Sequence, residues 1–340
     1  KSLNYDELAD YIVSIGEKKF RAAQLYSWMH EKLACSYDEM TNISDKLKKV
    51  LKENTLYTCL EPVRVQESQI DGTKKYLFRL YDGNLIESVF MRYHHGNSVC
   101  ISSQVGCKMG CRFCASTLNG CVRNLEPSEM LDQIYRISRD TNERVSNVVI
   151  MGSGEPMLNY DNVLNFIRLV HEPYCLNLGY RNITISTSGI VPGINKLAQE
   201  NLPITLSISL HAPNNELRTE LMPINKRYPI EEVIKAAVNY ANTTKRRITY
   251  EYILIDKYND NMTEAVELCK LLKNQLALAN VNLIPINPVK ERNYNRPSLA
   301  RIKAFAKYLN DHHLTATIRQ EMGTDIQAAC GQLRNKHLAK

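Results

Sequence analysis

The stretch CKMGCRFCAS, residues 107–116, holds Cys107, Cys111 and Cys114 within eight residues, at the spacing C-x3-C-x2-C. Three interpretations of this cluster are open. The thiols are structural, or they bind zinc with Cys121 as a fourth ligand, or they hold a 4Fe–4S cluster through three thiolates. A cluster with three protein ligands leaves one iron open for a bound molecule. That would explain why three cysteines, and not four, stand so close together.

The composition is that of an ordinary globular protein, and the expected location is the cytoplasm. The chain has 340 residues, 44% hydrophobic and 23% charged, and this length predicts one large domain plus a smaller one. The sequence contains no run of about 18 apolar residues, so no membrane span is expected. The opening KSLNYDELADY lacks the features of a signal peptide. In a reducing compartment the ten cysteines are not a disulfide framework, so a tight cluster of them indicates metal binding or catalysis.

The net charge is +7, and it comes from the chain after residue 60, because residues 1–60 hold nine Lys and Arg against nine Asp and Glu. A surplus of this size is compatible with a polyanionic partner, but many enzymes are mildly basic. Charge alone therefore does not decide between a nucleic-acid partner and a solvated surface.

Hydrophobic periodicity divides the chain into a helical start and an α/β body. Residues 4–53 repeat apolar side chains at helical spacing, with a helix cap expected at Ser44 or Asp45. Residues 62–103 hold short β-branched and aromatic runs between turn signals, which predict a hairpin and then the first strand of the main domain. Beyond this point strands and helices alternate. That pattern predicts a parallel α/β sheet or barrel with its site at the carboxyl ends of the strands.

The alternating part contains further strand and helix candidates. The strands are expected at 148–152, 183–189, 204–210, 248–255, 281–287 and 315–320. The helices are expected at 127–140, 161–171, 229–242, 262–275 and 298–311.

Three of these strand ends carry groups suited to binding a small molecule. In MGSGEP (151–156) the glycines let the backbone approach a ligand, and Glu155 can accept hydrogen bonds from an ammonium group. Ser186, Ser209 and His211 offer hydroxyls and an imidazole at the ends of the next two strands. Taken alone, MGSGEP is equally well a plain turn, and His211 a core histidine with satisfied hydrogen bonds.

Six motifs in order resemble the radical S-adenosylmethionine (SAM) adenine methyltransferases of the RlmN/Cfr type. They are SSQVGCKMGCRFC, MGSGEP, STSGIVP, SISLHAPN, LMPINKRYPI and DIQAACGQL, and the resemblance extends to KKFRAAQLYSWM in the helical start. It implies an α/β fold: a partial (β/α)6 radical SAM barrel with a small helical amino-terminal accessory domain and a connecting β-hairpin. The implied boundaries are 1–60 for the helical, RNA-binding domain, 61–96 for the hairpin linker, 97–320 for the barrel and 321–340 for the carboxyl-terminal loop.

The resemblance implies one 4Fe–4S cluster held by Cys107, Cys111 and Cys114, with SAM on the open iron and two SAM molecules used per turnover. The implied SAM contacts are at three strand ends and one late loop. They are Gly154, Glu155, Ser186, Ser209, Leu210, His211 and Asn287.

The resemblance also implies a route through a methylated cysteine. Cys330 takes a methyl group from one SAM, and a 5′-deoxyadenosyl radical from a second SAM removes a hydrogen from that methyl. The methylene radical then adds to an adenine carbon, which joins protein and RNA covalently. Glu87 is the implied proton acceptor, and Cys100 the resolving thiol that attacks the Cys330 sulfur and forms a transient disulfide. Without the resemblance, Glu87 would be interpreted as a solvent-facing strand carboxylate.

The family has two branches, and GEPMLN, STSG and SISLHAPN favour the branch that methylates carbon 2. Its substrates are an adenosine in the peptidyl transferase centre of 23S rRNA and an adenosine next to the anticodon in tRNA. The alternative is the Cfr-type branch, which methylates carbon 8 of the same rRNA adenosine and confers antibiotic resistance. The further expectations are an external, flavodoxin-like electron donor, no membrane partner, and action as a monomer.

Two readings from other classes remain open. One is a radical enzyme that acts on a protein or a small molecule, which would explain the three-cysteine loop but has no use for Cys100 and Cys330. The other is a non-enzymatic RNA-binding module with a zinc site. Metal analysis distinguishes the zinc-binding module from the radical enzymes, because the module requires bound zinc without iron or sulfide.

Overall fold

The computed structural model describes residues 1–288 and 292–328 of the chain. The main body is a ten-stranded sheet in the order β1-β2-β3-β4-β7-β8-β9-β10-β11-β12, and β5 and β6 form a separate two-stranded sheet. The strands are β1 (Glu61–Glu67), β2 (Lys74–Arg79), β3 (Leu85–Tyr93), β4 (Gly96–Ile101), β5 (Gln104–Gly106), β6 (Cys121–Asn124), β7 (Asn147–Ile150), β8 (Ile183–Thr187), β9 (Thr205–Ser209), β10 (Ile248–Leu254), β11 (Ala279–Pro285) and β12 (Ala316–Ile318).

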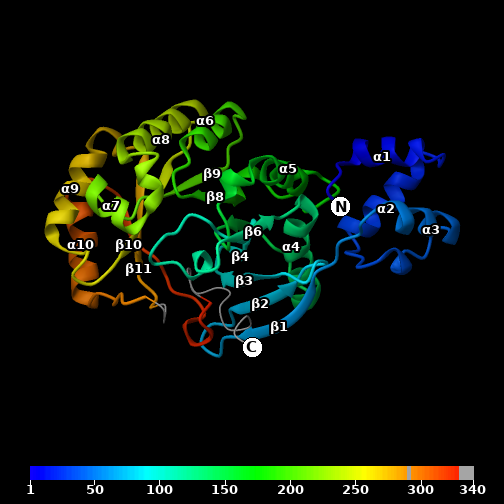
Figure 1. Cartoon of the computed structure of the whole chain (residues 1–340), viewed down its shortest axis with the longest axis horizontal. Helices are drawn as coiled ribbons and strands as arrows, with labels where there is room; N and C mark the ends of the chain where they lie inside the picture. The colour runs from blue at the N-terminus through cyan, green and yellow to red at the C-terminus, as the bar shows by residue number, and fades with distance from the viewer. Residues whose placement is uncertain (289–291, 329–340) are drawn as a thin grey trace.

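The part of the sheet from β4 to β12 is parallel, and every crossover between its strands carries at least one α-helix. In Figure 1 these helices follow the outer side of the sheet. The main hydrophobic core fills the layer between the strands and these helices. The helices are α4 (Pro127–Thr141), α5 (Tyr160–His171), α6 (Val191–Gln199), α7 (Asn215–Leu221), α8 (Ile230–Thr244), α9 (Met262–Leu272) and α10 (Leu299–Asp311). The predicted parallel α/β architecture is therefore confirmed.

Two of these helices, α6 and α7, were not expected from the sequence. In α6, Pro192 lies in the first turn, where a proline costs no hydrogen bond. Gly193 has a packing role, because a Cβ there would lie 2.7 Å from the Cβ of Met157. The glycine therefore lets α6 approach the segment after β7 closely.

The segment predicted as a connecting hairpin, 61–96, holds three strands, and they continue the main sheet. β1 pairs with β2, β2 with β3, and β3 with β4, all antiparallel. The sequence pattern marks these strands but not their partners, because partner choice depends on edges formed elsewhere in the chain. The segment is thus one edge of the barrel sheet and not a separate linker.

The amino-terminal domain has its own small core, formed by α1 (Tyr5–Ser14), α2 (Phe20–His30) and α3 (Asp45–Asn54). The predicted cap is confirmed at Ser44, whose side chain accepts a hydrogen bond from the Leu47 amide. Figure 1 shows these helices to one side of the barrel, next to α4 and α5. Among the helices described, none has both the length and the apolar character needed to cross a bilayer.

Candidate active site

The three-cysteine loop leaves the sheet between β5 and β6. Its two ends are joined by a hydrogen bond of 2.8 Å from the Cys107 amide to the Gly120 carbonyl. Inside it, the chain turns at Gly110, whose φ of 72° suits a residue without a side chain. The Thr117 hydroxyl closes the turn by donating to the carbonyls of Cys111 and Cys114. Local hydrogen bonds thus hold the loop in one shape.

The thiols of this loop sit on one wall of an open pocket at the carboxyl ends of the parallel strands. Cys107 and Cys111 are buried, and burial raises the pKa of the Cys107 thiol to about 12 and that of Cys111 well above its ordinary value. A cation must therefore offset their charge before they become thiolates. Cys107, Cys111 and Cys114 are the cysteines in the described lining of this pocket, and three thiols match a cluster with one open iron.

No group of three His, Cys, Asp or Glu side chains within 1–288 and 292–328 is arranged to hold a metal ion. A 4Fe–4S cluster places each thiolate on a different iron, so its ligands do not converge on one point as the ligands of zinc do. The three cysteines thus suit a cluster by residue type and position, and their ligand role stays a prediction.

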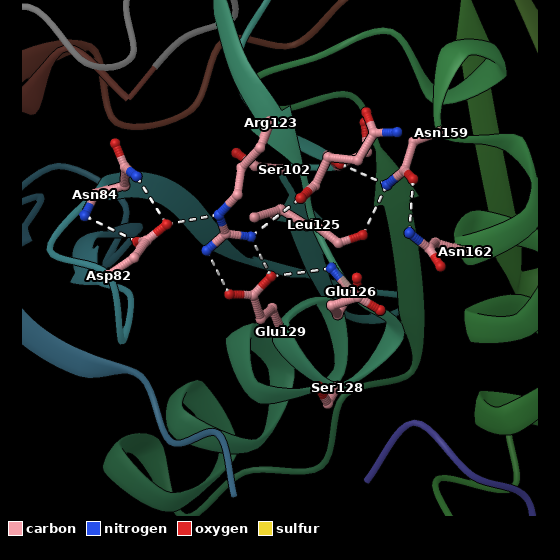
Figure 2. A network of polar contacts seen from close by, with 12 residues as sticks. Asp82, Asn84, Ser102, Arg123, Leu125, Glu126, Ser128, Glu129, Asn159 and Asn162 are labelled. Carbon is pink, nitrogen blue, oxygen red and sulfur yellow. Dashed lines mark hydrogen bonds and ion pairs between the residues drawn. The ribbon is translucent and has the colours of Figure 1, made fainter. Parts of the chain in front are cut away.

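An arginine anchors the far strand of this loop, as Figure 2 shows. Arg123 on β6 makes two hydrogen bonds of 2.8 Å to the fully buried Glu129 of α4, and a third of 2.6 Å to Asp82 in the turn before β3. Nearby, the Asn159 amide donates to the carbonyls of Ser103 and Leu125, at 2.8 Å each. These contacts tie the cluster loop to α4 and to the antiparallel edge of the sheet.

The pocket brings together almost all of the predicted SAM contacts. Its described lining includes the three cysteines together with Gly154, Glu155, Ser186, Ser209, His211 and Asn287. The exception is Leu210, whose side chain is fully buried and does not line the pocket. The Leu210 amide is also engaged, since it donates to the Glu251 carbonyl. The assignment of these residues to SAM stays a prediction.

The Glu155 carboxylate is already hydrogen-bonded to other residues of the chain. Its carboxylate accepts hydrogen bonds from the Thr187 hydroxyl and the Ser188 amide, both at 2.7 Å, and from the Met157 amide at 3.1 Å. Burial is the largest influence on its pKa, which is raised despite these donors. Glu155 therefore ties the end of β7 to the end of β8, and the predicted contact with an ammonium group would add to this structural role.

The residue before Glu155 is Gly154, and both its backbone conformation and its close neighbours require a residue without a side chain. Gly154 has a φ of 113°, and a Cβ there would lie 2.7 Å from the Cβ of Gln104. The side-chain oxygen of Gln104 also accepts a hydrogen bond of 2.8 Å from the Glu155 amide. The close approach of MGSGEP to β5 thus explains the glycine without any cofactor.

His211 combines a core position with a pocket position. Its Nδ1 accepts a hydrogen bond of 3.0 Å from the Ile253 amide, and its ring meets Phe113 edge to face. Burial, with a smaller effect of Arg218, lowers its pKa to about 3. A neutral imidazole that accepts at Nδ1 carries its proton on Nε2, so His211 can donate one hydrogen bond to a pocket ligand.

Arg218 and Glu251 are site residues that the sequence reasoning missed. Arg218 is fully buried, and its guanidinium donates to the carbonyls of Ser188 and Ser209 at 2.7 and 3.2 Å. Glu251 lines the pocket and accepts hydrogen bonds from Ser207, at 2.7 Å, and from Asn282. The carboxylate within the apolar run ITYEYILI was a usable signal, whereas nothing around Arg218 distinguishes it from an exposed helix residue.

Replacing Arg218 with methionine should lower the free energy of unfolding by about 3 kcal/mol, because buried carbonyls at the ends of β8 and β9 lose their donor. The measurement is the denaturant midpoint of the full chain. Arg227→Met is the matched control, since Arg227 is exposed and its loss should change stability by less than about 0.5 kcal/mol. Equal midpoints for both variants would contradict the structural role of Arg218.

A second pocket adjoins the first and shares Met151, Ile284, Asn287 and Arg319 with it. Cys100 lines this second pocket, and so does Ala328, the last residue of the described chain before Cys330. Cys330 itself lies outside the described residues. Cys100 pairs with Val89 across β3 and β4, so both side chains point to the same face of the sheet.

Glu87 lies on the same strand and face as Val89, because residues two apart in a strand point the same way. Its carboxylate forms an ion pair of 3.3 Å with Lys75 of β2, and both side chains are only 9% exposed. The alternative of a solvent-facing strand carboxylate is therefore wrong. Lys75 was not singled out in the sequence, since one lysine in a strand is ordinarily a solvated residue.

Comparisons with family models and with related proteins identify the class of enzyme to which this pocket belongs. Residues 101–269 match the model of the radical SAM superfamily, and residues 1–56 match that of the ribosomal RNA large subunit methyltransferase N-terminal domain. A protein of Lachnospira eligens named as a probable dual-specificity RNA methyltransferase RlmN is 60% identical over 99% of this chain and 96% of its own length. One of the same name from Lachnoclostridium phytofermentans is 52% identical over 100% of this chain and 95% of its own.

The solved structure of a radical SAM methyltransferase from Sphaerobacter thermophilus superposes with a TM-score of 0.93. It is 43% identical and covers 98% of both chains. The fold and the pocket thus define a radical SAM enzyme. Within that class, the chain belongs to the RlmN family of RNA methyltransferases. As a member it uses a 4Fe–4S cluster and SAM, with two SAM molecules per turnover.

Proposed function

We propose that the enzyme methylates carbon 2 of an adenosine in the peptidyl transferase centre of 23S rRNA and of an adenosine next to the anticodon in tRNA. Support for carbon 2 comes from relatives that carry the RlmN name, and not that of the Cfr-type alternative. We further propose that Cys330 carries the transferred carbon, that Glu87 accepts the proton, and that Cys100 resolves the adduct.

One observation carries this proposal: the segment that leads to Cys330 is held against Cys100. Asp325 accepts hydrogen bonds from the Ser68 hydroxyl at 2.6 Å and the Gln69 amide at 2.9 Å, both in the turn between β1 and β2. The Lys75 ammonium donates to the Gln327 carbonyl at 3.2 Å. Ala328 then packs in one apolar cluster with Cys100. Cys330, the proposed carrier, follows two residues later in the sequence and lies outside the described residues.

The chain's own groups divide the work of release between them. Glu87 is held next to Lys75 by an ion pair of 3.3 Å, and its carboxylate is the group in this part of the sheet that would act as the proton acceptor. The Cys100 thiolate would attack the Cys330 sulfur, which forms a disulfide and breaks the bond from that sulfur to the transferred carbon. The electron pair of the broken bond stays with the carbon, which takes up a proton and becomes the methyl group. The bound cluster and SAM would supply a 5′-deoxyadenosyl radical, the species that a carbon without nucleophilic character requires.

The remaining parts of the proposal concern the surroundings of the reaction. We place it in the cytoplasm, with a flavodoxin-like electron donor and a monomeric enzyme. The adenine must leave its stack to reach the pocket, as in other enzymes that modify bases. Basic residues after residue 60 would supply the salt-dependent part of the RNA affinity.

The test is a single labelling experiment. The protein is reconstituted anaerobically with iron and sulfide, reduced, and given methyl-deuterated SAM with protein-free 23S rRNA or tRNA. Mass spectrometry of the nucleosides should show labelled 2-methyladenosine that has lost one deuterium. Labelled 8-methyladenosine would overturn the choice of carbon. No labelled adenosine from an enzyme that still cleaves SAM would overturn RNA as the substrate.

Replacing Lys75 with methionine should lower turnover about tenfold, because the buried Glu87 carboxylate loses its ion-pair partner and the Gln327 carbonyl loses a donor. The measurement is the rate of 2-methyladenosine formation. Lys75→Arg should keep the parent rate, and Lys74→Met is a matched control because Lys74 pairs with Asp140 and Glu67 instead. A Lys75→Met rate equal to that of the parent would contradict the role of the pair.

A further inference from the structure

Two cysteines outside the active site, Cys35 and Cys59, lie side by side where the helical domain joins the sheet. Cys35 follows α2, and Cys59 precedes β1 by two residues. Their side chains are hydrogen-bonded to each other, and both are partly exposed. A solute can therefore reach them, and a small movement would bring the two sulfurs to bonding distance.

Two arginines of α4 face the Cys35 sulfur. The Nη1 atom of Arg136 is 2.6 Å from it, and that of Arg139 is 3.2 Å from it. Glu39 opposes them, since its carboxylate accepts from Arg139 at 3.0 Å. The hydrogen bond from Cys59 is the largest cause that lowers the pKa of Cys35, to about 6, and the two guanidinium charges add to it against the effect of burial. Cys35 therefore has the surroundings of a nucleophilic thiolate.

Cys59 has the opposite character. The hydrogen bond that it donates to Cys35 raises its pKa most, followed by burial and by the charge of Asp132, while Lys1 acts in the other direction. One thiol is thus prepared to attack while its neighbour keeps a proton. This division between an attacking and a resolving thiol is the one that thiol–disulfide exchange requires.

We propose that Cys35 and Cys59 are a redox-active thiol pair that low-molecular-weight disulfides, such as oxidised glutathione, convert to an intramolecular disulfide. In the first step the Cys35 thiolate attacks one sulfur of glutathione disulfide, which forms a mixed disulfide and releases one glutathione thiolate. In the second step Cys59 loses its proton to that thiolate or to water and attacks the Cys35 sulfur. This step releases the second glutathione. The two protein thiols lose two electrons, which reduce one glutathione disulfide to two thiols.

The position of the pair indicates what its oxidation changes. A bond between Cys35 and Cys59 closes the segment that carries α3 and five of the thirteen buried residues of the helical core. It also removes the negative charge that Arg136 and Arg139 contact. Cys35, Cys59 and the two arginines are absent from the described linings of both active-site pockets, so the pair is a modification site additional to Cys100 and Cys330.

The test uses the anaerobic holoenzyme, incubated with oxidised glutathione, blocked with an alkylating agent and digested with trypsin without reduction. The expected product is a disulfide between fragments 33–46 and 53–64, which contain Cys35 and Cys59. Cys59→Ser should stop at the glutathione adduct on 33–46, and Cys35→Ser should show neither product. Both variants should methylate RNA like the parent under reducing conditions. A parent enzyme without the 33–46 to 53–64 link, while other cysteines react, would overturn the proposal.

A second measurement follows the reactivity of Cys35 directly. The rate at which iodoacetamide alkylates Cys35 in the parent should be half-maximal near pH 6, since only the thiolate reacts. In Arg136→Gln the rate at pH 6 should be about fivefold lower, as expected for a pKa about one unit higher. A half-maximal rate in the parent near the ordinary thiol value of about 8.5 would also overturn the proposal.

Discussion

Cys111→Ala should abolish methylation and SAM cleavage together, with an expected loss of at least about a thousandfold in both. Cys111 is 8% exposed, and its carbonyl is held by Thr117, so the substitution removes the thiolate with little change to the loop backbone. Two remaining thiolates cannot hold a 4Fe–4S cluster in the pocket. The measurements are iron and sulfide per chain after anaerobic reconstitution, and 5′-deoxyadenosine formed from SAM.

Cys121→Ala is the matched control for this prediction. Cys121 lies on β6, opposite Gly106 and close to the loop in sequence, and the zinc interpretation requires it as the fourth ligand. The variant should keep its iron, sulfide and SAM cleavage. Loss of bound metal in Cys121→Ala as well, with zinc and no sulfide in the parent, would support the zinc site and contradict the cluster.

Cys100→Ala should stop the reaction after the first covalent step, so that a protein–RNA adduct accumulates on a denaturing gel. Cys100 is buried in the same apolar cluster as Ala328, and alanine fits this space while it removes the attacking sulfur. The rate of multiple turnover should fall at least about a hundredfold, because release of RNA from the adduct then depends on attack by a group from solution. Formation of the adduct should persist, since the cluster loop and the SAM pocket are unchanged.

Cys175→Ala serves as the control here, because Cys175 contacts Tyr135 and lies outside both pockets. It should turn over like the parent and leave no adduct. The resolving role of Cys100 is wrong if Cys100→Ala also turns over like the parent. Digestion of the accumulated species should yield an adenosine bound to the tryptic fragment that contains Cys330, and attachment elsewhere would contradict the role of Cys330.

Features of this protein that depend on residues close together in the chain were predictable from the sequence. The C-x3-C-x2-C spacing, the cap at Ser44 and the alternation of strands and helices are local patterns. Each of them reflects contacts within about one turn or one strand, where sequence separation and spatial separation coincide. For the same reason, the strand ends at Glu155, Ser186 and Ser209 could be assigned to one pocket before its shape was known.

Only the tertiary structure decided which groups meet across long stretches of chain. The partners of Glu155 on β8, the burial of Arg218 beneath two strand ends and the pair of Lys75 with Glu87 follow from strand pairing and helix packing. The contact of Cys35 with Arg136 spans 101 residues and two domains. The sequence shows the type of a charged residue but not whether that residue is buried. The free energy of desolvation distinguishes a buried charge from an exposed one, and it depends on the groups that the rest of the chain places around the charge.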